Sequence, residues 1–225
     1  IKGEFNSAYN ELEFSIESDK INIYNRELSD LNIRAYTKRN QLIFNLDSDE
    51  LKYTRSNSLK NFMVSSRVFN DSIKTNLNWN NWLDINYSGN INSLISFSNK
   101  NNTKPKIKID FAPSNIILVD TLWTLSESSI IKDSSGITVN QLNATNGHSM
   151  LSLNGKLSRN VTDSLLVNVK NISLSHLNVL LDKLKISGNV NGRGVIKDIW
   201  GTKQINTDVD IADFSINNEL IGRTY

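Results

Sequence analysis

Apolar and polar residues alternate one by one along most of this chain. Polar residues separate Leu12, Phe14 and Ile16, and the same spacing recurs over 31–35. Because successive side chains of a β-strand point to opposite faces of a sheet, this period of two predicts strands with one apolar and one polar face. We predict such strands at 12–16, 31–35, 42–46, 73–77, 83–87, 107–111, 151–157, 165–169, 184–190 and 205–211.

Residues that favour turns separate these segments. We predict turns at Asp47-Ser48-Asp49, Ser88-Gly89-Asn90, Ser134-Ser135-Gly136, Asn146-Gly147 and Asn160. The strands follow one another at the spacing of roughly 8 to 12 residues that is typical of antiparallel meanders, sandwiches and barrels. No rhythm of alternating strands and helices interrupts them, so the chain is predicted to be all-β and mostly antiparallel.

The composition favours a sheet with one wet side. Hydrophobic residues make up 38% of the chain, below the usual globular share, and a sheet solvated on one face accommodates so small a number. The net charge is +2, with 25 Lys and Arg and 23 Asp and Glu interspersed along the chain, which gives no case for nucleic acid. The absence of Cys excludes disulfides and thiolate metal sites.

Two segments depart from the strand pattern. Leu174, Leu177 and Leu181 have the i, i+3, i+7 spacing of an amphipathic helix, with Ser173 or Ser175 as the N-cap. We therefore predict one short helix near Ser173–Leu181, most simply a connector between strands. The polar stretch 98–105, which ends in a proline, is the candidate for a repeat or subdomain edge.

Motifs for catalysis or metal binding are weak. His148 and His176 have no partner at metal-ligand spacing, and no G-x-S-x-G elbow marks a nucleophile; His176 is expected on the polar side of the short helix. The acidic residues of 47–50 lack the pattern of an EF-hand loop and are interpreted as a solvated turn. The glycines of 188–194 precede no helix, so they are expected to mark bulges or close backbone approach.

The four tryptophans are the remaining candidates for ligand contacts. Trp79, Trp82, Trp123 and Trp200 could stack on sugars or bases, but no basic cluster surrounds them. Packing in the core or at its rim is the stronger expectation. The chain is therefore predicted not to be an enzyme, with no catalytic residues, no metal and no cofactor.

The second half carries an ordered series of segments. They are Pro105-Lys106-Ile107-Lys108-Ile109, Ile117-Leu118-Val119-Asp120-Thr121-Leu122-Trp123, Leu151-Ser152-Leu153-Asn154-Gly155-Lys156-Leu157-Ser158, Asp163-Ser164-Leu165-Leu166-Val167, Leu174-Ser175-His176-Leu177-Asn178, Ile186-Ser187-Gly188-Asn189-Val190-Asn191-Gly192, Asp213-Phe214-Ser215-Ile216-Asn217 and Ile221-Gly222. In this order they resemble the TamB branch of the AsmA-like proteins, in its Bacteroidetes-type form. The resemblance covers roughly residues 105–225, and the first half agrees with it in strand rhythm.

The resemblance implies a fold and a function. Members of the family fold as a long twisted sheet curled lengthwise into a trough, the β-taco, with an apolar inner face. Such proteins act as bridge-like conduits that carry phospholipids between the inner and outer membranes and contribute to biogenesis of the outer membrane. The family also implies a periplasmic location, an inner-membrane anchor and an Omp85-type partner in the outer membrane. We expect residues 1–225 to be a single elongated segment of a larger protein, with the anchor outside it.

The apolar face would then contact the acyl chains of phospholipids. The predicted lining residues are Ile107, Ile109, Phe111, Leu151, Leu153, Leu165, Val167, Val169, Ile186, Val190, Val209, Ile211 and Phe214. A slip of one residue in register would move any of them to the other face. Alternation alone equally fits a closed sandwich with a dry core, and the alternative function is a structural or adhesive β-module of the cell envelope or surface.

Overall fold

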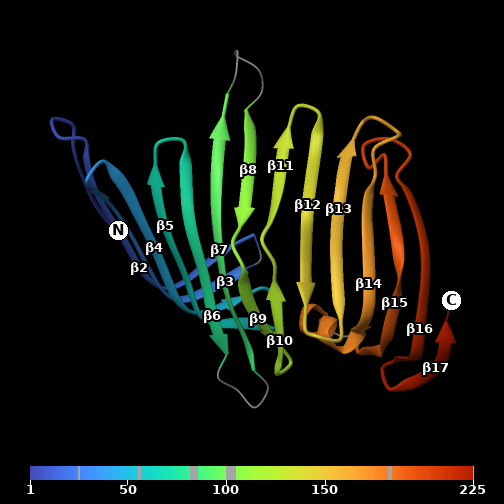
Figure 1. The fold of residues 1–225 in the computed structure, drawn as a ribbon. Coiled ribbons are helices and arrows are strands. Elements are labelled where there is room, and N and C mark those ends of the chain that lie inside the picture. Colours follow the sequence, from blue (N-terminus) through green and yellow to red (C-terminus); the bar gives the residue numbers. More distant parts are fainter. Residues whose placement is uncertain (25, 55–56, 82–85, 100–104, 182–183, 225) are drawn as a thin grey trace.

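The prediction of an all-β chain is confirmed. The computed structural model describes residues 1–225 apart from 25, 55–56, 82–85, 100–104, 182–183 and 225. The described residues form one antiparallel sheet of 17 strands (Figure 1). In chain order the elements are β1 (Lys2–Asn6), β2 (Glu11–Ile23), β3 (Arg26–Lys38), β4 (Gln41–Lys52), β5 (Ser58–Phe69), β6 (Ser72–Asn81), β7 (Tyr87–Ser98), β8 (Lys106–Phe111), β9 (Ser114–Leu118), β10 (Thr121–Leu125), β11 (Ser128–Asp133), β12 (Gly136–Thr145), β13 (Met150–Ser158), β14 (Leu165–Ser173), the 3₁₀ helix η1 (Leu174–Leu180), β15 (Ile186–Lys197), β16 (Gln204–Ile216) and β17 (Glu219–Thr224).

The sheet is a meander in which two rows are broken. β8 and β9 together lie along β7, and β10 and β11 together lie along β12. The break between β8 and β9 contains Pro113, which has no N–H to give to a ladder. The Ser114 hydroxyl bridges this break: it accepts the Asn92 N–H at 3.2 Å and donates to the Ala112 carbonyl at 2.9 Å.

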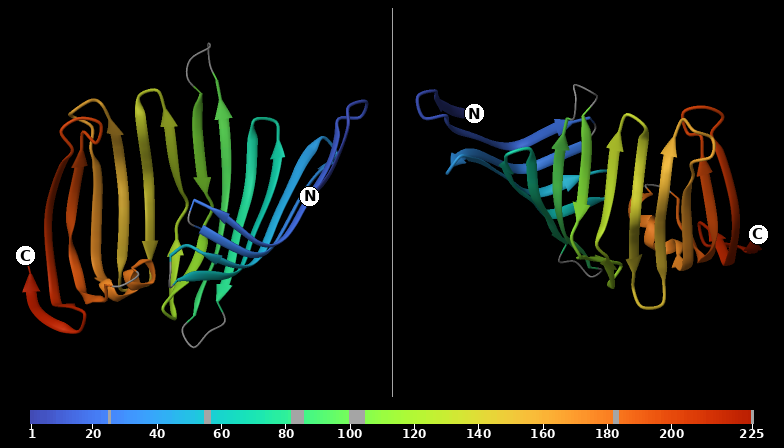
Figure 2. Two further views of the ribbon diagram at one scale, coloured as in Figure 1. Left: turned by 180° about the vertical axis from the view of Figure 1, so that it is seen from behind. Right: turned by 45° about the horizontal axis from the view of Figure 1, so that its top comes forward.

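The sheet is strongly twisted and curls back over itself. In Figure 1, the lower parts of β2–β5 pass behind β6–β10, and in the view from behind they lie in front of β8–β10 (Figure 2). The other half of the sheet, β12–β17, forms a second wall. The arrangement agrees with the predicted trough.

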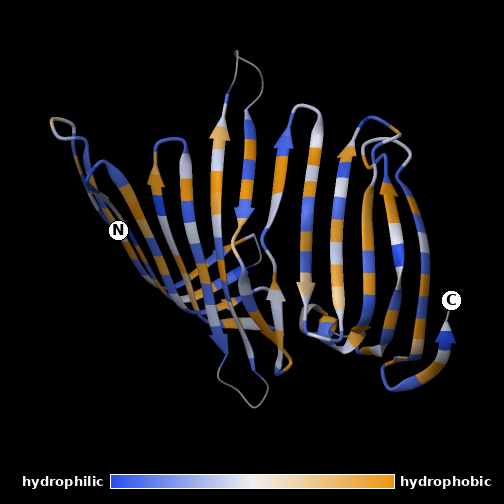
Figure 3. Ribbon diagram, in the orientation of Figure 1, coloured by the Kyte–Doolittle hydropathy of each residue, from blue (hydrophilic) through white to orange (hydrophobic). Residues whose placement is uncertain are grey.

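One face of the sheet is apolar. Ile95 is opposite Ile109, Ile109 is opposite Ile130, and Ile130 is opposite Val139. Because residues paired across antiparallel strands share a face, this row defines a face that we call the inner face. Along each strand the hydropathy alternates, as the orange and blue stripes of Figure 3 show.

The opposite, outer face is polar and rich in asparagine. The Asn76 amide donates to Asn90 at 2.8 Å and to Asn92 at 3.0 Å, across neighbouring strands. Further along the sheet, Arg223 forms two 2.8 Å hydrogen bonds to the Asp210 carboxylate. The chain therefore solvates one face of the sheet, as its composition predicts.

Bulges keep the apolar residues on the inner face where the alternation changes phase. In β12, Val139 and Leu142 are three residues apart, yet they are opposite Gly155 and Leu153, which are two apart. Gln141 lies between them with a φ of 49°. The same three-residue step occurs across Asn171 in β14 and across Asp213 in β16. Each step restores the apolar side chains to the inner face.

Asparagine side chains bond the backbone N–H groups that these irregularities leave out of the ladders. Asn154 Oδ1 accepts the N–H of Gln141 at 3.1 Å, and Asn191 Oδ1 accepts the N–H of Asn171 at 2.8 Å. Since an unbonded backbone N–H is costly, these contacts give the abundant Asn residues a structural role.

Two of the predicted turns are wrong. Residues 47–49 lie inside β4, and residues 88–90 lie inside β7. Ser48 is buried, and its hydroxyl donates to the Ser29 carbonyl at 2.6 Å within the sheet. Gly89 does not reverse the chain. It allows the Trp79 ring to lie against the backbone, because a Cβ at this position would be 2.1 Å from that ring. The turns predicted at 134–136, 146–147 and 160 do connect strands.

Two further sequence expectations fall partly outside the described residues. The strand predicted at 83–87 is described from residue 86 onward, and β7 begins at Tyr87. Residues 100–104 of the predicted edge at 98–105 also lie outside. On either side of them, Ser98 of β7 is opposite Lys106 of β8, so the sheet continues across this position.

The buried core is small. Among the described residues, the apolar side chains classed as buried are Leu28, Leu31, Ala35, Trp79, Trp123, Val139 and Leu165. The accessible surface is 14790 Å². A compact protein of 25.4 kDa exposes about 10,300 Å², so the surface found here is roughly two-fifths larger than that of a compact protein. So large a surface favours an open trough over a sealed sandwich.

We predict that Gly89→Ala destabilises the sheet by about 1–3 kcal/mol, because the new methyl group would overlap the Trp79 ring. Urea unfolding measures the effect. Gly194→Ala is the matched control, since a Cβ there meets its nearest atom at 3.7 Å. Equal stability of the two variants would contradict the tight packing of Trp79 on Gly89.

Candidate functional site: the inner face of the trough

The registers of the ladders place the predicted lining residues strand by strand. Ile109 is linked through Ile130 to Val139, which is opposite Gly155 in β13. Gly155 is in turn opposite Leu165 in β14. The predicted residues of β8 and β14 therefore lie on the same face, although the two strands are far apart in the sheet.

The remaining predicted residues follow from the next ladders. Leu151 is opposite Val169, which is opposite Gly192, and Val190 is opposite Ile211. With the bulge at Asp213 included, the inner face holds all thirteen predicted residues: Ile107, Ile109, Phe111, Leu151, Leu153, Leu165, Val167, Val169, Ile186, Val190, Val209, Ile211 and Phe214. The structure thus brings the whole predicted set to one surface.

These thirteen side chains are neither sealed nor fully exposed. Leu165 is buried, with 8% of its surface exposed, and the other twelve are half-buried. A dry core would exclude water from most of such a set. The inner face is therefore an apolar surface that a ligand from outside can reach.

No charged residue interrupts the inner face over the described strands β13–β16. Its positions on β15 are Ile186, Gly188, Val190, Gly192, Gly194 and Ile196. Gly194 lies between Val167 and Thr207, and a Cβ built there would meet them at ordinary contact distance. Gly194 therefore leaves room for a methyl group between these two side chains.

From the sequence, these glycines were expected at bulges or at close backbone approach, and their place on the inner face was not predicted. A bulge does lie beside Gly188, between Ser187 and Asn189, so that prediction is confirmed. Period-two spacing from Val190 was the signal that could have placed Gly192 and Gly194 among the lining positions.

At one end of the trough, η1 and the residue that follows it contact Trp123 of β10 and Asn57, which directly precedes β5. The His176 ring of η1 meets the Trp123 ring edge-on, with 5.8 Å between centroids and 89° between planes. Trp123 is on the inner face, because it is opposite Ile116, which is opposite Gly89. The Asn57 amide reaches the Leu181 carbonyl at 3.5 Å, so the two halves of the sheet touch here.

The short helix differs from its prediction. It is a 3₁₀ helix over Leu174–Leu180, and Ser173 occupies the N-cap position without a side-chain cap bond. Leu177 is 41% exposed, so it is not part of a buried stripe. His176 was expected on the polar side but is half-buried against Trp123. With three residues per turn, the helix aligns 174, 177 and 180 and turns His176 toward a different side.

The Asn178 side chain holds η1 to the start of β15. Its amide donates to the Ile186 carbonyl at 3.0 Å, and its oxygen accepts the Ile186 N–H at 2.9 Å. This pair of bonds fixes the helix next to the strand that follows it.

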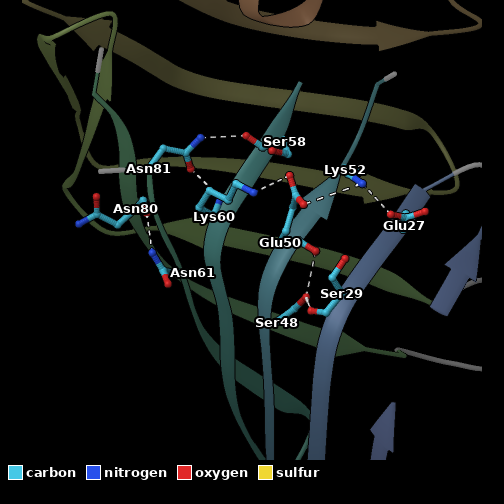
Figure 4. Close-up of polar contacts among 10 residues, drawn as sticks. All are labelled: Glu27, Ser29, Ser48, Glu50, Lys52, Ser58, Lys60, Asn61, Asn80 and Asn81. Carbon is cyan, nitrogen blue, oxygen red and sulfur yellow. Dashed lines mark hydrogen bonds and ion pairs between the residues drawn. The ribbon is translucent and has the colours of Figure 1, made fainter. Parts of the chain in front are cut away.

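The acidic residues of 47–50 do not form the solvated turn predicted for them. Glu50 belongs to a ladder of ion pairs across β2–β5 (Figure 4). Lys60 binds Glu50 at 2.7 Å, Lys52 binds Glu27 at 2.8 Å, and Lys20 also binds Glu27. Hydrogen bonds from Lys20 and Lys52 lower the pKa of Glu27, and those from Lys60 and Ser58 lower the pKa of Glu50. These carboxylates are engaged in holding strands together.

Other candidates for chemistry are placed as follows. Trp79 and Trp123 are buried, which confirms their expected packing role, and Trp200 is 45% exposed at the rim; Trp82 lies outside the described residues. Within the described part of the chain, no group of three His, Asp or Glu side chains is arranged to hold a metal ion. No helix there is long and apolar enough to cross a membrane.

We predict that stability falls as the pH drops below about 6.5, the ordinary value for histidine. Burial lowers the pKa of His176, so the unfolded chain binds a proton that the folded chain resists, and acid favours unfolding. Unfolding by urea at a series of pH values above 5 measures this. His176→Gln should flatten the profile in this window, whereas His148→Gln, at an exposed position, should leave it unchanged. An unaltered profile in His176→Gln would contradict the role of this ring.

The chain matches no protein-family model, no curated protein and no solved structure. The resemblance to the TamB branch stays a prediction from the ordered segments of the sequence.

Proposed function

We propose that the inner face binds the hydrocarbon chains of lipids and acts as a non-enzymatic conduit for them. The observation that carries the proposal is the collection of thirteen apolar side chains on one largely half-buried face of an open trough, a face that carries no charged residue over the described strands β13–β16. An exposed apolar surface of this extent is costly in water unless something apolar covers it.

The energetics support a lipid as the occupant. Transfer of a chain of about 16 carbons from a membrane into water costs on the order of 10 kcal/mol. A continuous apolar wall offers the chain a similar environment at each position, so movement along it avoids that single large barrier. The polar headgroup stays in water at the open side of the trough.

The resemblance to TamB extends the proposal to a cellular setting. It supports phospholipid transport between the inner and outer membranes, a periplasmic location, and an Omp85-type partner for the larger protein. The rival function is a structural or adhesive β-module, in which the same face would bind no lipid.

We expect phospholipid to co-purify with the chain when it is produced in a Gram-negative bacterium. Organic extraction of the washed protein, followed by mass spectrometry, detects it. Recovery of no lipid from folded protein would favour the structural or adhesive module.

We predict that Val167→Asp lowers lipid binding about tenfold or more, because a carboxylate would then face the hydrocarbon chain. The fold should survive, since Val167 is only half-buried and is opposite Gly194, which has no side chain. Leu166→Asp is the matched control: this neighbour points to the other face, is 44% exposed, and should leave binding unchanged. Unfolding of Val167→Asp, with Leu166→Asp intact, would indicate a dry core and contradict the proposal.

A further inference from the structure

A pocket lies at the end of the trough away from η1. β14 begins at Leu165 and ends at Ser173, next to η1, so the turn that precedes β14 is at the opposite end of the sheet. The pocket has a volume of about 740 Å³ and lies among this turn, the β11–β12 and β15–β16 turns and the start of β8. Its walls include Ile107, Lys132, Arg159 and Trp200.

Hydrogen bonds within the turns hold the walls of this pocket. The Asp133 carboxylate accepts the Ser135 hydroxyl at 2.6 Å and the Ser135 N–H at 2.8 Å. In the next turn, the Ser158 hydroxyl, which is buried, donates to Asp163 at 2.7 Å, and Lys156 pairs with Asp163 at 3.3 Å. Both acidic side chains of the pocket are therefore already engaged.

The third turn is ordered in the same way and carries the tryptophan. The Asp198 carboxylate accepts the Thr202 N–H at 2.8 Å and the Thr202 hydroxyl at 3.0 Å. Trp200, inside this turn, is 45% exposed. A half-exposed indole presents an apolar ring together with a polar N–H, a combination that suits the boundary between hydrocarbon and water.

Two cations of the pocket have no carboxylate partner among the described residues. Lys132 and Arg159 are both exposed, and no ion pair or side-chain hydrogen bond between described residues involves either one. The formal charge of the lining side chains is +1, from Lys132, Lys156 and Arg159 against Asp133 and Asp163. The pocket thus favours an anion.

The position of Lys132 connects this charge to the apolar wall. Lys132 is opposite Ile107, and the preceding inner-face pair, Ile130 and Ile109, is apolar. Along these two strands the inner face therefore passes from hydrocarbon to a cation at the rim. An amphiphile with an anionic head and an apolar chain matches this order of groups.

We propose that the pocket binds the phosphate of an anionic glycerophospholipid, with Lys132 and Arg159 as its ligands and the acyl chain on the inner face. The proposal rests on the proposed function and adds a preference for headgroup charge. Arg159 provides planar paired donors that fit phosphate oxygens, and Lys132 provides a point charge beside them. Trp200 lies at the level where the headgroup meets the chain.

The experiment compares two short-chain lipids with identical acyl chains, phosphatidylglycerol and phosphatidylcholine, by equilibrium binding to the purified chain. We expect about tenfold tighter binding of phosphatidylglycerol at low salt. Lys132→Gln/Arg159→Gln should abolish that preference by weakening phosphatidylglycerol more than phosphatidylcholine, whose choline cation offsets the charge of its own phosphate. Salt of about 1 M should weaken it as well, because charges are then screened beyond about 3 Å.

The matched control is Arg67→Gln/Lys74→Gln. Arg67 and Lys74 are exposed and lie opposite each other on the outer face. Their replacement removes one arginine and one lysine charge, as in the test variant. The control should keep the full preference for phosphatidylglycerol. A loss of preference in the control as large as in the test variant would show that overall charge is responsible and would overturn the pocket.

The remaining outcomes separate this proposal from the proposed function. Equal binding of the two lipids overturns the headgroup site and leaves lipid conduction standing. Binding of neither lipid overturns both. Inorganic phosphate is the third ligand: if it binds the chain as tightly as phosphatidylglycerol does, the pocket is a site for free anions and the lipid assignment fails.

Discussion

The structure depends on keeping one face of a very long antiparallel ladder apolar. In a β-strand, any single inserted residue moves every later side chain to the opposite face. Over 17 strands such errors would mix polar and apolar groups on both faces. The chain avoids this with bulges at residues such as Gln141, Asn171 and Asp213, where a left-handed φ lets two residues oppose one. Asparagine side chains then bond some of the N–H groups that the bulges leave free.

Much of the architecture could be predicted from the alternation, and the failures have physical causes. Twelve of the thirteen proposed lining residues lie in segments with a clear local period of two, and the bulge at Asp213 brings Phe214 to the same face. Residues 47–49 and 88–90 were assigned to turns because Asp, Ser and Gly are typical of turns. Here Ser48 bonds a neighbouring strand and Gly89 makes room for Trp79, and both roles depend on partners distant in sequence.

The phase changes have a signal in the sequence that a strict period of two overlooks. Leu28 and Leu31 are three residues apart and both buried, with Asp30 between them at a φ of 48°. The pairs Val169 and Ile172, and Ile211 and Phe214, repeat this spacing around an Asn or an Asp. The pocket at the rim could not be found in this way, because the position of Lys132 beside Ile107 requires the register between strands.

The order of the ladders has a consequence for how the molecule forms and fails. Apart from the two broken rows, each strand pairs with those that directly precede and follow it, so most contacts close short loops. Such local connectivity speeds folding. It also makes the stability of the sheet approximately a sum of interactions between adjacent strands, as in repeat proteins. A lesion in one hairpin would then loosen that hairpin and its neighbours first, while distant hairpins keep their shape. An elongated protein of this design could grow or shorten by whole hairpins during evolution without redesign of a central core.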